Sequence, residues 1–434
     1  MAEVSRRDFL SSAATLAAGG LAGMSLTEAM AQPAAKLAES LPKRVLGRTG
    51  WKTSVIGYGT IFRDPEPGRW LTDKEADLLF NTAIDCGINT IEIGAIYDDA
   101  ERWVGKVLPK RRRDELFIST KSTKVKKAEV LRELEESLKL LNTDHVDCLD
   151  MHNYYSFIFY DEAMAAGGAF EALKQAQKEG KTRFIGITGH SCQVTMHAMR
   201  SGEFDCVVIP YNAGTREFER ALNLAAKLNI GVMNMKPYGG SALLSYNPRD
   251  PLQAPVVLTP EECLRYVLSH PGVSAAIPNS STMEQLKHNL AIAATFKPLT
   301  PAERTEIEAK VDRKMGGACG ECKEKPCEKA CPNQVPISYM LSNLQAARVG
   351  YHDNWRRGDQ YQTLAVDFTA CDRGACGLCE KACPKKFSII KNMETYHNTV
   401  REYRGRQAVS AYWKKIRYDE KPVNNASKVV KKEG

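Results

Sequence analysis

The stretch LFISTKSTKVKKAEVLRELEESLKLLNTDHVDCLDMH, residues 116–152, contains the pattern that predicts the fold. Two short runs of apolar and β-branched residues, at 116–121 and 146–152, flank a segment at 127–141 with the 3.6-residue periodicity of an amphipathic helix. A strand, a helix and a second strand in this order favour two parallel strands joined by a crossover helix.

The same alternation continues over residues 43–298. The strand-like runs are VIGYG (55–59), NTIEI (89–93), LFISTK (116–121), VDCLDMH (146–152), TRFIGIT (182–188), CVVIPY (206–211), IGVMNMK (230–236) and VSAAIP (273–278). Eight strand–helix units of this total length are typical of a closed (β/α)8 TIM barrel. An open doubly wound sheet is the alternative, but no GxGxxG motif follows the first run. A hairpin at 44–56 precedes the first barrel strand, and we expect it to cap the bottom of the barrel.

The first thirty residues have the features of a targeting segment. SRRDFL (5–10) carries paired arginines, a weakly apolar run follows, and AMAQ (29–32) provides an A-x-A cleavage pattern. This arrangement resembles a twin-arginine (Tat) export signal. An ordinary Sec signal and an uncleaved lipid-facing anchor are the alternatives. We therefore expect a protein that the Tat machinery exports to the periplasm or another extracytoplasmic compartment, and not an integral membrane protein.

The chain has 434 residues and a formal net charge of +8, part of which lies in its last residues. A charge of this size at the end of a chain is typical of a solvated tail, so we expect no nucleic-acid partner.

Eight of the thirteen cysteines lie in two groups near the C-terminus. The first group is Cys319-x2-Cys322-x4-Cys327-x3-Cys331-Pro, and the second is Cys371-x4-Cys376-x2-Cys379-x3-Cys383-Pro. Closely spaced thiolates can ligate one [4Fe–4S] cluster, and a cysteine before proline usually ligates the other cluster of a two-cluster ferredoxin. The long, helix-like spacer resembles helical ferredoxin-type domains. A swapped arrangement would give one cluster Cys319, Cys322, Cys327 and Cys383, and the other Cys371, Cys376, Cys379 and Cys331.

Two other uses of these cysteines are open. Zinc sites also use Cys-x2-Cys pairs, although they have no need of Cys-x3-Cys-Pro. Disulfides are the usual state of cysteines outside the cytoplasm, but a Tat substrate is exported folded and could carry clusters inserted in the cytoplasm. We assign no function to the remaining cysteines, which are Cys86, Cys148, Cys192, Cys206 and Cys263.

Ionisable residues stand at the carboxyl ends of three consecutive predicted strands, where (β/α)8 enzymes carry their chemistry. Glu92 ends the second strand and Tyr97 follows it, Lys121 ends the third strand, and His152 ends the fourth. A lysine beside a tyrosine favours the phenolate and makes the tyrosine a usable proton donor. Each residue alone also has a structural interpretation, as a salt bridge or a packed ring.

The barrel region resembles the aldo-keto reductase family. The resemblance rests on VLGRTGWKTSVIGYGT, on the Y-x-x-x-E-x-x-x-G pattern that begins at Tyr97, and on FISTK, GKTRFIGITGHS, PYN, MKPYGG and IPNSSTMEQLKHNL. It implies carbonyl reduction or alcohol oxidation of a small molecule with NAD(P)H. Tyr97 would be the general acid, Lys121 its partner and His152 the residue that orients the substrate, with Glu92 at the family's aspartate position.

The implied nicotinamide site departs from the family pattern. Thr188-Gly189 replaces Ser-Asn, Val208 replaces a glutamine, and Gln285 replaces an arginine. The residues that the resemblance assigns to NADP(H) or NAD(H) are Thr188, Gly189, Asn212, Lys236, Ser280, Ser281, Gln285 and Asn289.

The sequence thus predicts five segments: a signal peptide (1–31), a linker (32–42), the barrel (43–298), a ferredoxin-type, mainly helical iron–sulfur domain (299–395) and a basic tail (396–434). The expected protein is an exported oxidoreductase that acts on a small carbonyl or alcohol and exchanges electrons with a redox partner protein. The alternatives are a non-catalytic electron-transfer or binding protein, and an enzyme whose clusters only stabilise its structure.

Overall fold

The computed structural model describes residues 25–30, 32–60, 71–154, 157–240, 243–244, 258–315, 322, 324–348, 368–371 and 376–404. The chain divides into two compact units. The first comprises residues up to Pro210 together with Phe218–Pro237 and Leu264–Leu299. The second comprises Tyr211–Glu217, Tyr238–Cys263 and the chain from Thr300 onward.

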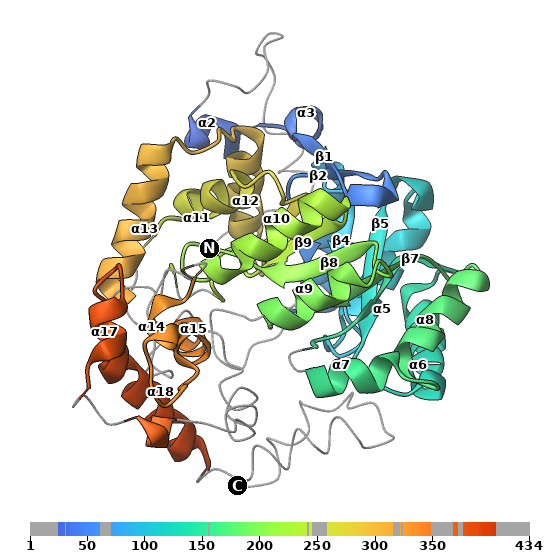
Figure 1. The fold of residues 1–434 in the computed structure, drawn as a ribbon. Coiled ribbons are helices and arrows are strands. Elements are labelled where there is room, and N and C mark those ends of the chain that lie inside the picture. The colour runs from blue at the N-terminus through green and yellow to red at the C-terminus, as the bar shows by residue number, and fades with distance from the viewer. Residues whose placement is uncertain are drawn as a thin grey trace, which may run out of the picture. The chain divides into compact units, whose positions relative to one another are not determined.

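The first unit is the predicted barrel (Figure 1). Its parallel strands are β3 (Tyr58–Gly59), β4 (Thr90–Glu92), β5 (Phe117–Ser122), β6 (Val146–Met151), β7 (Thr182–Thr188), β8 (Cys206–Pro210), β9 (Gly231–Met235) and β10 (Ala275–Ile277). They lie in sequence order. Parallel bridges from Ile56 to Ala276 and from Gly59 to Asn279 join the first strand to the last, so the sheet closes. The eight predicted strands and the closed topology are confirmed.

Helices follow the strands, as a (β/α)8 fold requires. In the first unit they are α4 (Asp73–Asp85), α5 (Ala100–Val107), α6 (Lys127–Leu141), α7 (Phe157–Met164), α8 (Ala169–Lys178), α9 (Cys192–Arg200), α10 (Glu219–Leu228) and α12 (Met283–Ala294). Helix α11 (Pro260–Leu268) crosses the boundary between the units. Local sequence sets these bounds. For example, Thr72 and Glu75 form a reciprocal capping box at the start of α4, and Asn142 ends α6 in a left-handed conformation.

The predicted hairpin is present as antiparallel β1 (Lys43–Val45) and β2 (Lys52–Ser54), and its turn contributes to the apolar interior of the barrel. Leu46, from its turn, is fully buried in a cluster with Phe117 and Cys148. Gly47 has φ +50°, and a Cβ at this position would lie 2.1 Å from the Gly231 amide nitrogen. Glycine is therefore required where the turn approaches the start of β9.

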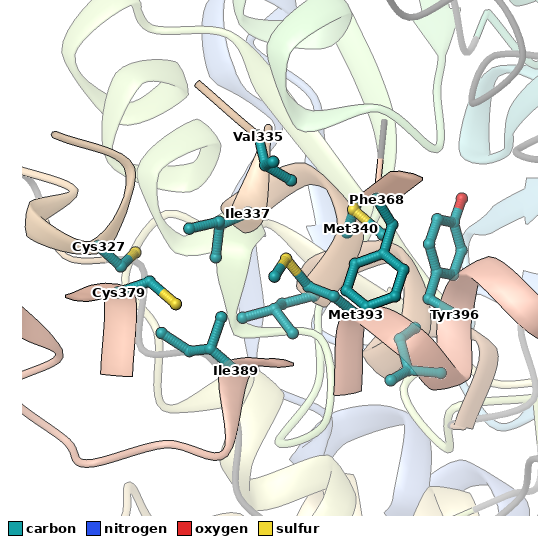
Figure 2. Packing of buried hydrophobic residues seen from close by; sticks show 11 residues of the cluster. Cys327, Val335, Ile337, Met340, Phe368, Cys379, Ile389, Met393 and Tyr396 are labelled. Carbon is teal, nitrogen blue, oxygen red and sulfur yellow. The ribbon is translucent and has the colours of Figure 1, made fainter. Parts of the chain in front are cut away.

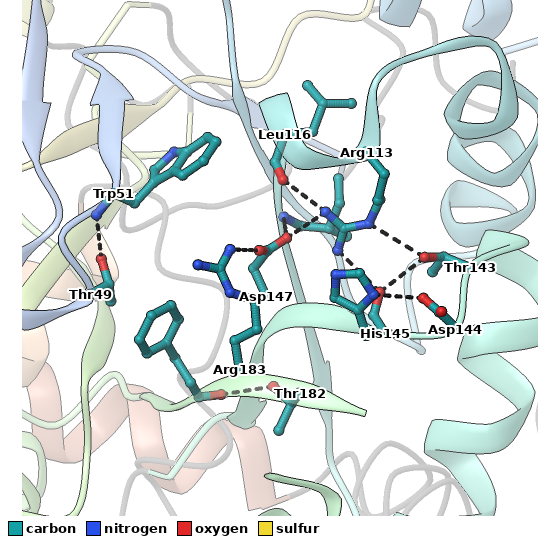
Figure 3. A network of polar contacts seen from close by, with 12 residues as sticks. Thr49, Trp51, Arg113, Leu116, Thr143, Asp144, His145, Asp147, Thr182 and Arg183 are labelled. Carbon is teal, nitrogen blue, oxygen red and sulfur yellow. Dashed lines mark hydrogen bonds and ion pairs between the residues drawn. The ribbon is translucent and has the colours of Figure 1, made fainter. Parts of the chain in front are cut away.

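A buried carboxylate joins three segments at the amino-terminal ends of β5 and β6 (Figure 3). Asp147 is 1% exposed and pairs with Arg113 at 2.7 Å and with Arg183 at 2.6 Å. It also accepts the Ile118 amide at 2.9 Å. Because each carboxylate oxygen has a cationic partner, the buried charge is compensated.

The second unit has its own apolar core. Its described helices are α13 (Pro301–Met315), α14 (Pro326–Lys329), α15 (Ile337–Arg348), α17 (Leu378–Ala382) and α18 (Ile389–Arg404). Helix α14 packs on α17, and α15 packs on α18. Figure 2 shows Cys327 and Cys379 at one end of the resulting core, and Phe368 and Tyr396 at the other.

The two cysteine-bearing halves of this core repeat one local structure. Each contains the sequence EKACP, at 328–332 and again at 380–384. The Glu328 carboxylate accepts the Ser338 amide at 2.8 Å, and the Glu380 carboxylate accepts the amide of the corresponding Ile390 at 3.0 Å. The residues that precede the short helices, Lys325 and Gly377, are both left-handed, with φ +44° and +54°. The second unit is therefore built around an internal duplication.

The structure differs from the predicted segment borders near both ends. Residues 32–42, predicted to be a linker, contain helix α3 (Ala34–Ser40), which packs on α4 and α12 because its apolar face, including Ala34 and Leu37, is buried. Helix α2 (Leu26–Met30) lies within the predicted signal peptide and packs on α12. Helix α18 continues to Arg404, nine residues into the predicted tail.

Other predicted features lie outside the described residues, namely most of the signal peptide, much of the spacer between the cysteine groups and the tail beyond Arg404. Among the helices that the structure describes, none has the length and apolar character needed to span a membrane.

Candidate active site at the carboxyl ends of the strands

The structure brings together the four residues that the sequence singled out. Glu92 ends β4, Lys121 lies on β5 and His152 directly follows β6, while Tyr97 lies in the loop between β4 and α5. Glu92, Lys121 and His152 are 5%, 2% and 7% exposed. Tyr97 is only half-buried, so it is the member of the group that solvent or a substrate can reach.

The contacts among these side chains form a continuous chain. The Lys121 ammonium pairs with the Glu92 carboxylate and donates to the Ile93 carbonyl. The same ammonium lies 5.1 Å from the centre of the Tyr97 ring. The Tyr97 hydroxyl lies 3.4 Å from His152 Nε2, and the two rings meet edge to face. The arrangement places a phenolic proton beside an imidazole and above a buried cation.

The loop that carries Tyr97 is fixed by its own sequence. The Tyr97 amide donates to the Gly94 carbonyl at 2.9 Å, and Asp98 adopts a left-handed φ of +44° before α5 begins. A Cβ on Gly94 would lie 3.1 Å from Lys121 Cγ and 3.2 Å from the Tyr97 ring. Such contacts are tight, so the glycine allows the ring and the lysine stem to lie close together.

A third buried carboxylate lies in the barrel interior, and the sequence analysis missed it. Asp150 is fully buried, and its register partner on β5 is Lys121. Ser119 Oγ donates to it at 2.6 Å and Cys148 Sγ contacts it at 3.5 Å. Burial raises the pKa of the Asp150 carboxyl to about 6. The available signal was a charged residue two positions before His152, on the same face of a strand that is otherwise buried.

The predicted nicotinamide residues at the end of β7 are already engaged with the protein. The Thr188 hydroxyl accepts the Asn153 amide at 2.7 Å. A Cβ on Gly189 would lie 2.6 Å from the Thr195 hydroxyl, which explains why no side chain is present there. The departure from the family pattern at position 189 therefore has a packing cause.

The loop before α12 is also internally bonded. Asn289 Nδ2 donates to Ser280 Oγ at 3.0 Å, and both side chains are buried. The Gln285 side chain accepts the Ser281 amide at 2.8 Å. Tyr58 Oη holds the same loop through the Ser280 carbonyl at 2.8 Å.

The last two predicted cofactor residues belong to different units. Lys236 follows β9 with a left-handed φ of +56°. Asn212 belongs to the second unit, where its side chain accepts the Gly214 amide at 2.9 Å. The roles of all eight residues in cofactor binding stay predictions.

Seven of the eight predicted cluster ligands lie within the described residues, and Cys319 lies outside them. None of the described cysteines is joined in a disulfide. Over the same residues, no three or more His, Cys, Asp or Glu side chains are arranged as a group that could hold a metal ion. The ligand set therefore stays a prediction.

A pocket of about 730 Å³ lies away from this site. It is lined by the β1–β2 hairpin and by segments within 84–89 and 110–116, which precede β4 and β5. The amino-terminal ends of barrel strands serve stability more often than catalysis, and we assign no chemistry to this pocket.

The barrel matches a known family. The model described as "Aldo/keto reductase family" matches residues 55–255. Over these residues the chain is similar to the aldo/keto reductase family. The family match ends before the cysteine groups begin, so the resemblance predicted from the sequence is confirmed for the barrel.

Individual proteins and solved structures show the same similarity. The chain is 26% identical over 306 residues to the uncharacterized oxidoreductase YqkF of Bacillus subtilis, covering 62% of this chain and 95% of the relative. It is 25% identical to the L-galactose dehydrogenase of Arabidopsis thaliana, covering 61% and 93%. The solved structure of aldo-keto reductase AKR11C1 from Bacillus halodurans superposes with a TM-score of 0.53 at 23% identity. The match covers 62% of this chain and 96% of that structure, and it supports the fold. These similarities support an oxidoreductase of the aldo-keto reductase type.

Proposed function

We propose that this protein reduces the carbonyl group of a small molecule, or oxidises the corresponding alcohol, with Tyr97 as the general acid or base. The observation that carries the proposal is the contact of the Tyr97 hydroxyl with His152 Nε2 at 3.4 Å, next to the buried Lys121–Glu92 pair.

Each residue has a defined task in the proposed reaction. His152 orients the substrate oxygen beside the Tyr97 hydroxyl. In reduction, the hydroxyl gives its proton to that oxygen, and the Lys121 cation stabilises the phenolate that remains. Glu92 holds the Lys121 ammonium in place through their ion pair. In alcohol oxidation, the phenolate takes the proton back.

A nicotinamide cofactor would supply or accept the hydride. The loop before α12 fits such a cofactor in one respect, because it ends at the amino terminus of a twelve-residue helix, where a phosphate is favoured. Gln285, which replaces the arginine seen in many NADPH users, is neutral, and its side-chain oxygen accepts the Ser281 amide of the loop. NADP(H) or NAD(H) would therefore be held mainly by backbone groups and by Ser280, Ser281 and Asn289.

The second unit binds two [4Fe–4S] clusters in this proposal, through the eight clustered cysteines. The internal duplication supports this, since each half presents the same Cys-x3-Cys-Pro segment. Cys371 and Cys376 lie near Cys379, and Cys383 lies near Cys327. These neighbours are the ones that the swapped ligand arrangement requires.

The remaining parts of the proposal concern location and partners. The paired arginines of SRRDFL support export of the folded protein to the periplasm by the Tat machinery. Free NAD(P)H is scarce there, so the cofactor is retained from the cytoplasm or a redox partner protein delivers electrons through the clusters.

A second candidate is a non-catalytic electron-transfer or binding protein. It is favoured by the engagement of Thr188 with the backbone and by the absence of room for a side chain at position 189.

One titration separates these candidates. The anaerobically purified protein is titrated with NADPH and with NADH while cluster absorbance and cofactor fluorescence are followed together. Saturable binding with turnover of an aldehyde is expected for the enzyme. Reducible clusters without any cofactor binding would instead identify the electron-transfer protein, and bound cofactor with clusters that never change redox state would make the clusters structural.

A further inference from the structure

Asp150 lies in the barrel interior next to the charged residues of the candidate site. The register of β5 and β6 pairs Lys121 with Asp150, so both side chains leave the sheet on the same face. Asp150 also pairs with Gly186 on β7, and a Cβ at position 186 would lie 1.7 Å from Asp150 Oδ1. The barrel therefore leaves a space at Gly186 that the carboxylate occupies.

The surroundings of this carboxylate are specific. The groups that face Asp150 are Glu92 on β4, Ser119 and Lys121 on β5, Cys148 on its own strand β6, and Cys206 on β8. Lys121 is the single cation in this set. Two buried carboxylates, Glu92 and Asp150, therefore share one positive charge, and the set is negative whenever both are ionised.

We propose that Asp150 is a positioning residue that acts through Lys121, by setting the charge of the interior and hence the pH at which Tyr97 loses its proton. This inference rests on the proposed function, because it gives a role in the same site. An ionised Asp150 opposes formation of the Tyr97 phenolate, since two negative charges then share the Lys121 cation. It keeps Tyr97 protonated at neutral pH and so favours carbonyl reduction over alcohol oxidation.

The burial of Asp150 makes this effect depend on pH. Burial raises the pKa of its carboxyl to about 6, so the group gains its charge just below neutral pH. Ionisation of Asp150 then adds one negative charge to the set of Glu92, Lys121 and Asp150.

The test follows the Tyr97 hydroxyl and needs no substrate. Ultraviolet absorbance of tyrosinate is titrated in the protein and in Tyr97→Phe, and the difference isolates Tyr97 from the other tyrosines. In an Asp150→Asn background, which keeps an acceptor for Ser119, the Tyr97 midpoint is expected to fall by on the order of one pH unit. Asp147→Asn, on the same strand, serves as the control, because it removes a structural carboxylate and is expected to leave the midpoint unchanged.

Ser119→Ala gives a second reading if Asp150→Asn folds poorly. Loss of the Ser119 hydrogen bond raises the pKa of the Asp150 carboxyl, so its carboxylic-acid infrared band persists to higher pH. Two results would overturn the inference. One is an unchanged Tyr97 midpoint in Asp150→Asn, and the other is an Asp150 infrared band that disappears at the same pH with and without Ser119→Ala. Failure of the proposed function would give a different result. The unsubstituted protein would then show no carbonyl turnover, whatever the Tyr97 midpoint in the titration.

Discussion

At the scale of single residues, Gly94 determines how closely the Tyr97 ring approaches Lys121. Gly94→Ala places a methyl group 3.1–3.2 Å from both side chains, so the ring must shift away from His152. We expect kcat to fall by about 10- to 100-fold with little loss of stability, because misplacement of a reacting group is costly. Gly202→Ala is the matched control. It strains a left-handed φ of +81° far from the site in sequence and is expected to lower thermal stability while sparing kcat.

The buried Asp150 carboxyl leads us to expect that the free energy of unfolding depends on pH. The folded protein holds the Asp150 proton more tightly than the unfolded chain, because burial raises its pKa to about 6. The free energy of unfolding therefore decreases as pH rises from about 4 to about 6, by up to about 3 kcal/mol for a fully buried group. Chemical denaturation at several pH values checks this. Asp150→Asn is expected to lack that decrease, and parallel curves for the two proteins would argue against a buried titrating carboxyl.

The sequence predicts which candidate residues lie close together where each stands near a strand end, while their roles stay predictions. Glu92, Lys121 and His152 follow directly from the ends of three predicted strands, and Tyr97 follows from its loop. Asp150 was not predicted, because it lies inside the run 146–152 and not at its end, although it shares a strand face with His152. The packing reason for Gly189 depends on Thr195 of α9. Only the folded chain brings these two residues together.

At the scale of secondary-structure elements, the β1–β2 hairpin depends on Leu46 for its place in the barrel core. Leu46 is completely buried, with an exposed fraction of 0%. Leu46→Ala is expected to lower the free energy of unfolding by about 2–4 kcal/mol, measured by chemical denaturation. Val45→Ala is the control, because Val45 is 55% exposed, and it should change stability by less than about 0.5 kcal/mol. Equal effects of the two substitutions would mean that the hairpin does not close the core.

The elements were predictable to different degrees for physical reasons. Each barrel strand is an apolar run followed by a segment with helical periodicity. The sequence pattern therefore predicts the alternation of strands and helices in the barrel. Helix α3 was missed because its seven residues form barely two turns, and its stability comes from packing on α4 and α12 and not from its own sequence signal.

At the scale of the whole molecule, the proposed clusters predict metal content. Protein purified without oxygen is expected to contain about eight irons per chain, and Cys379→Ser about four, because one of two clusters loses a ligand. Cys192→Ser is the control, since Cys192 lies on α9 of the barrel, and its iron content should match that of the unsubstituted protein. Iron and acid-labile sulfide assays measure both. Zinc in place of iron would contradict the cluster assignment.

The division of the molecule was predicted only in part. The sequence places the barrel and a cysteine-rich unit in the right order, because their compositions differ. It does not reveal that residues 211–217 and 238–263 group with the second unit, since this depends on contacts such as those of Arg216 with Asp312 and of Lys310 with Glu262.

The central claim is that Tyr97 transfers the proton in an aldo-keto reductase reaction. The most direct measurement compares NADPH-dependent reduction of a generic aldehyde, 4-nitrobenzaldehyde, by the unsubstituted protein, Tyr97→Phe and the control Tyr160→Phe. The account predicts turnover by the first and third proteins and a loss of at least about 100-fold in kcat for Tyr97→Phe. Unchanged turnover by Tyr97→Phe would contradict it.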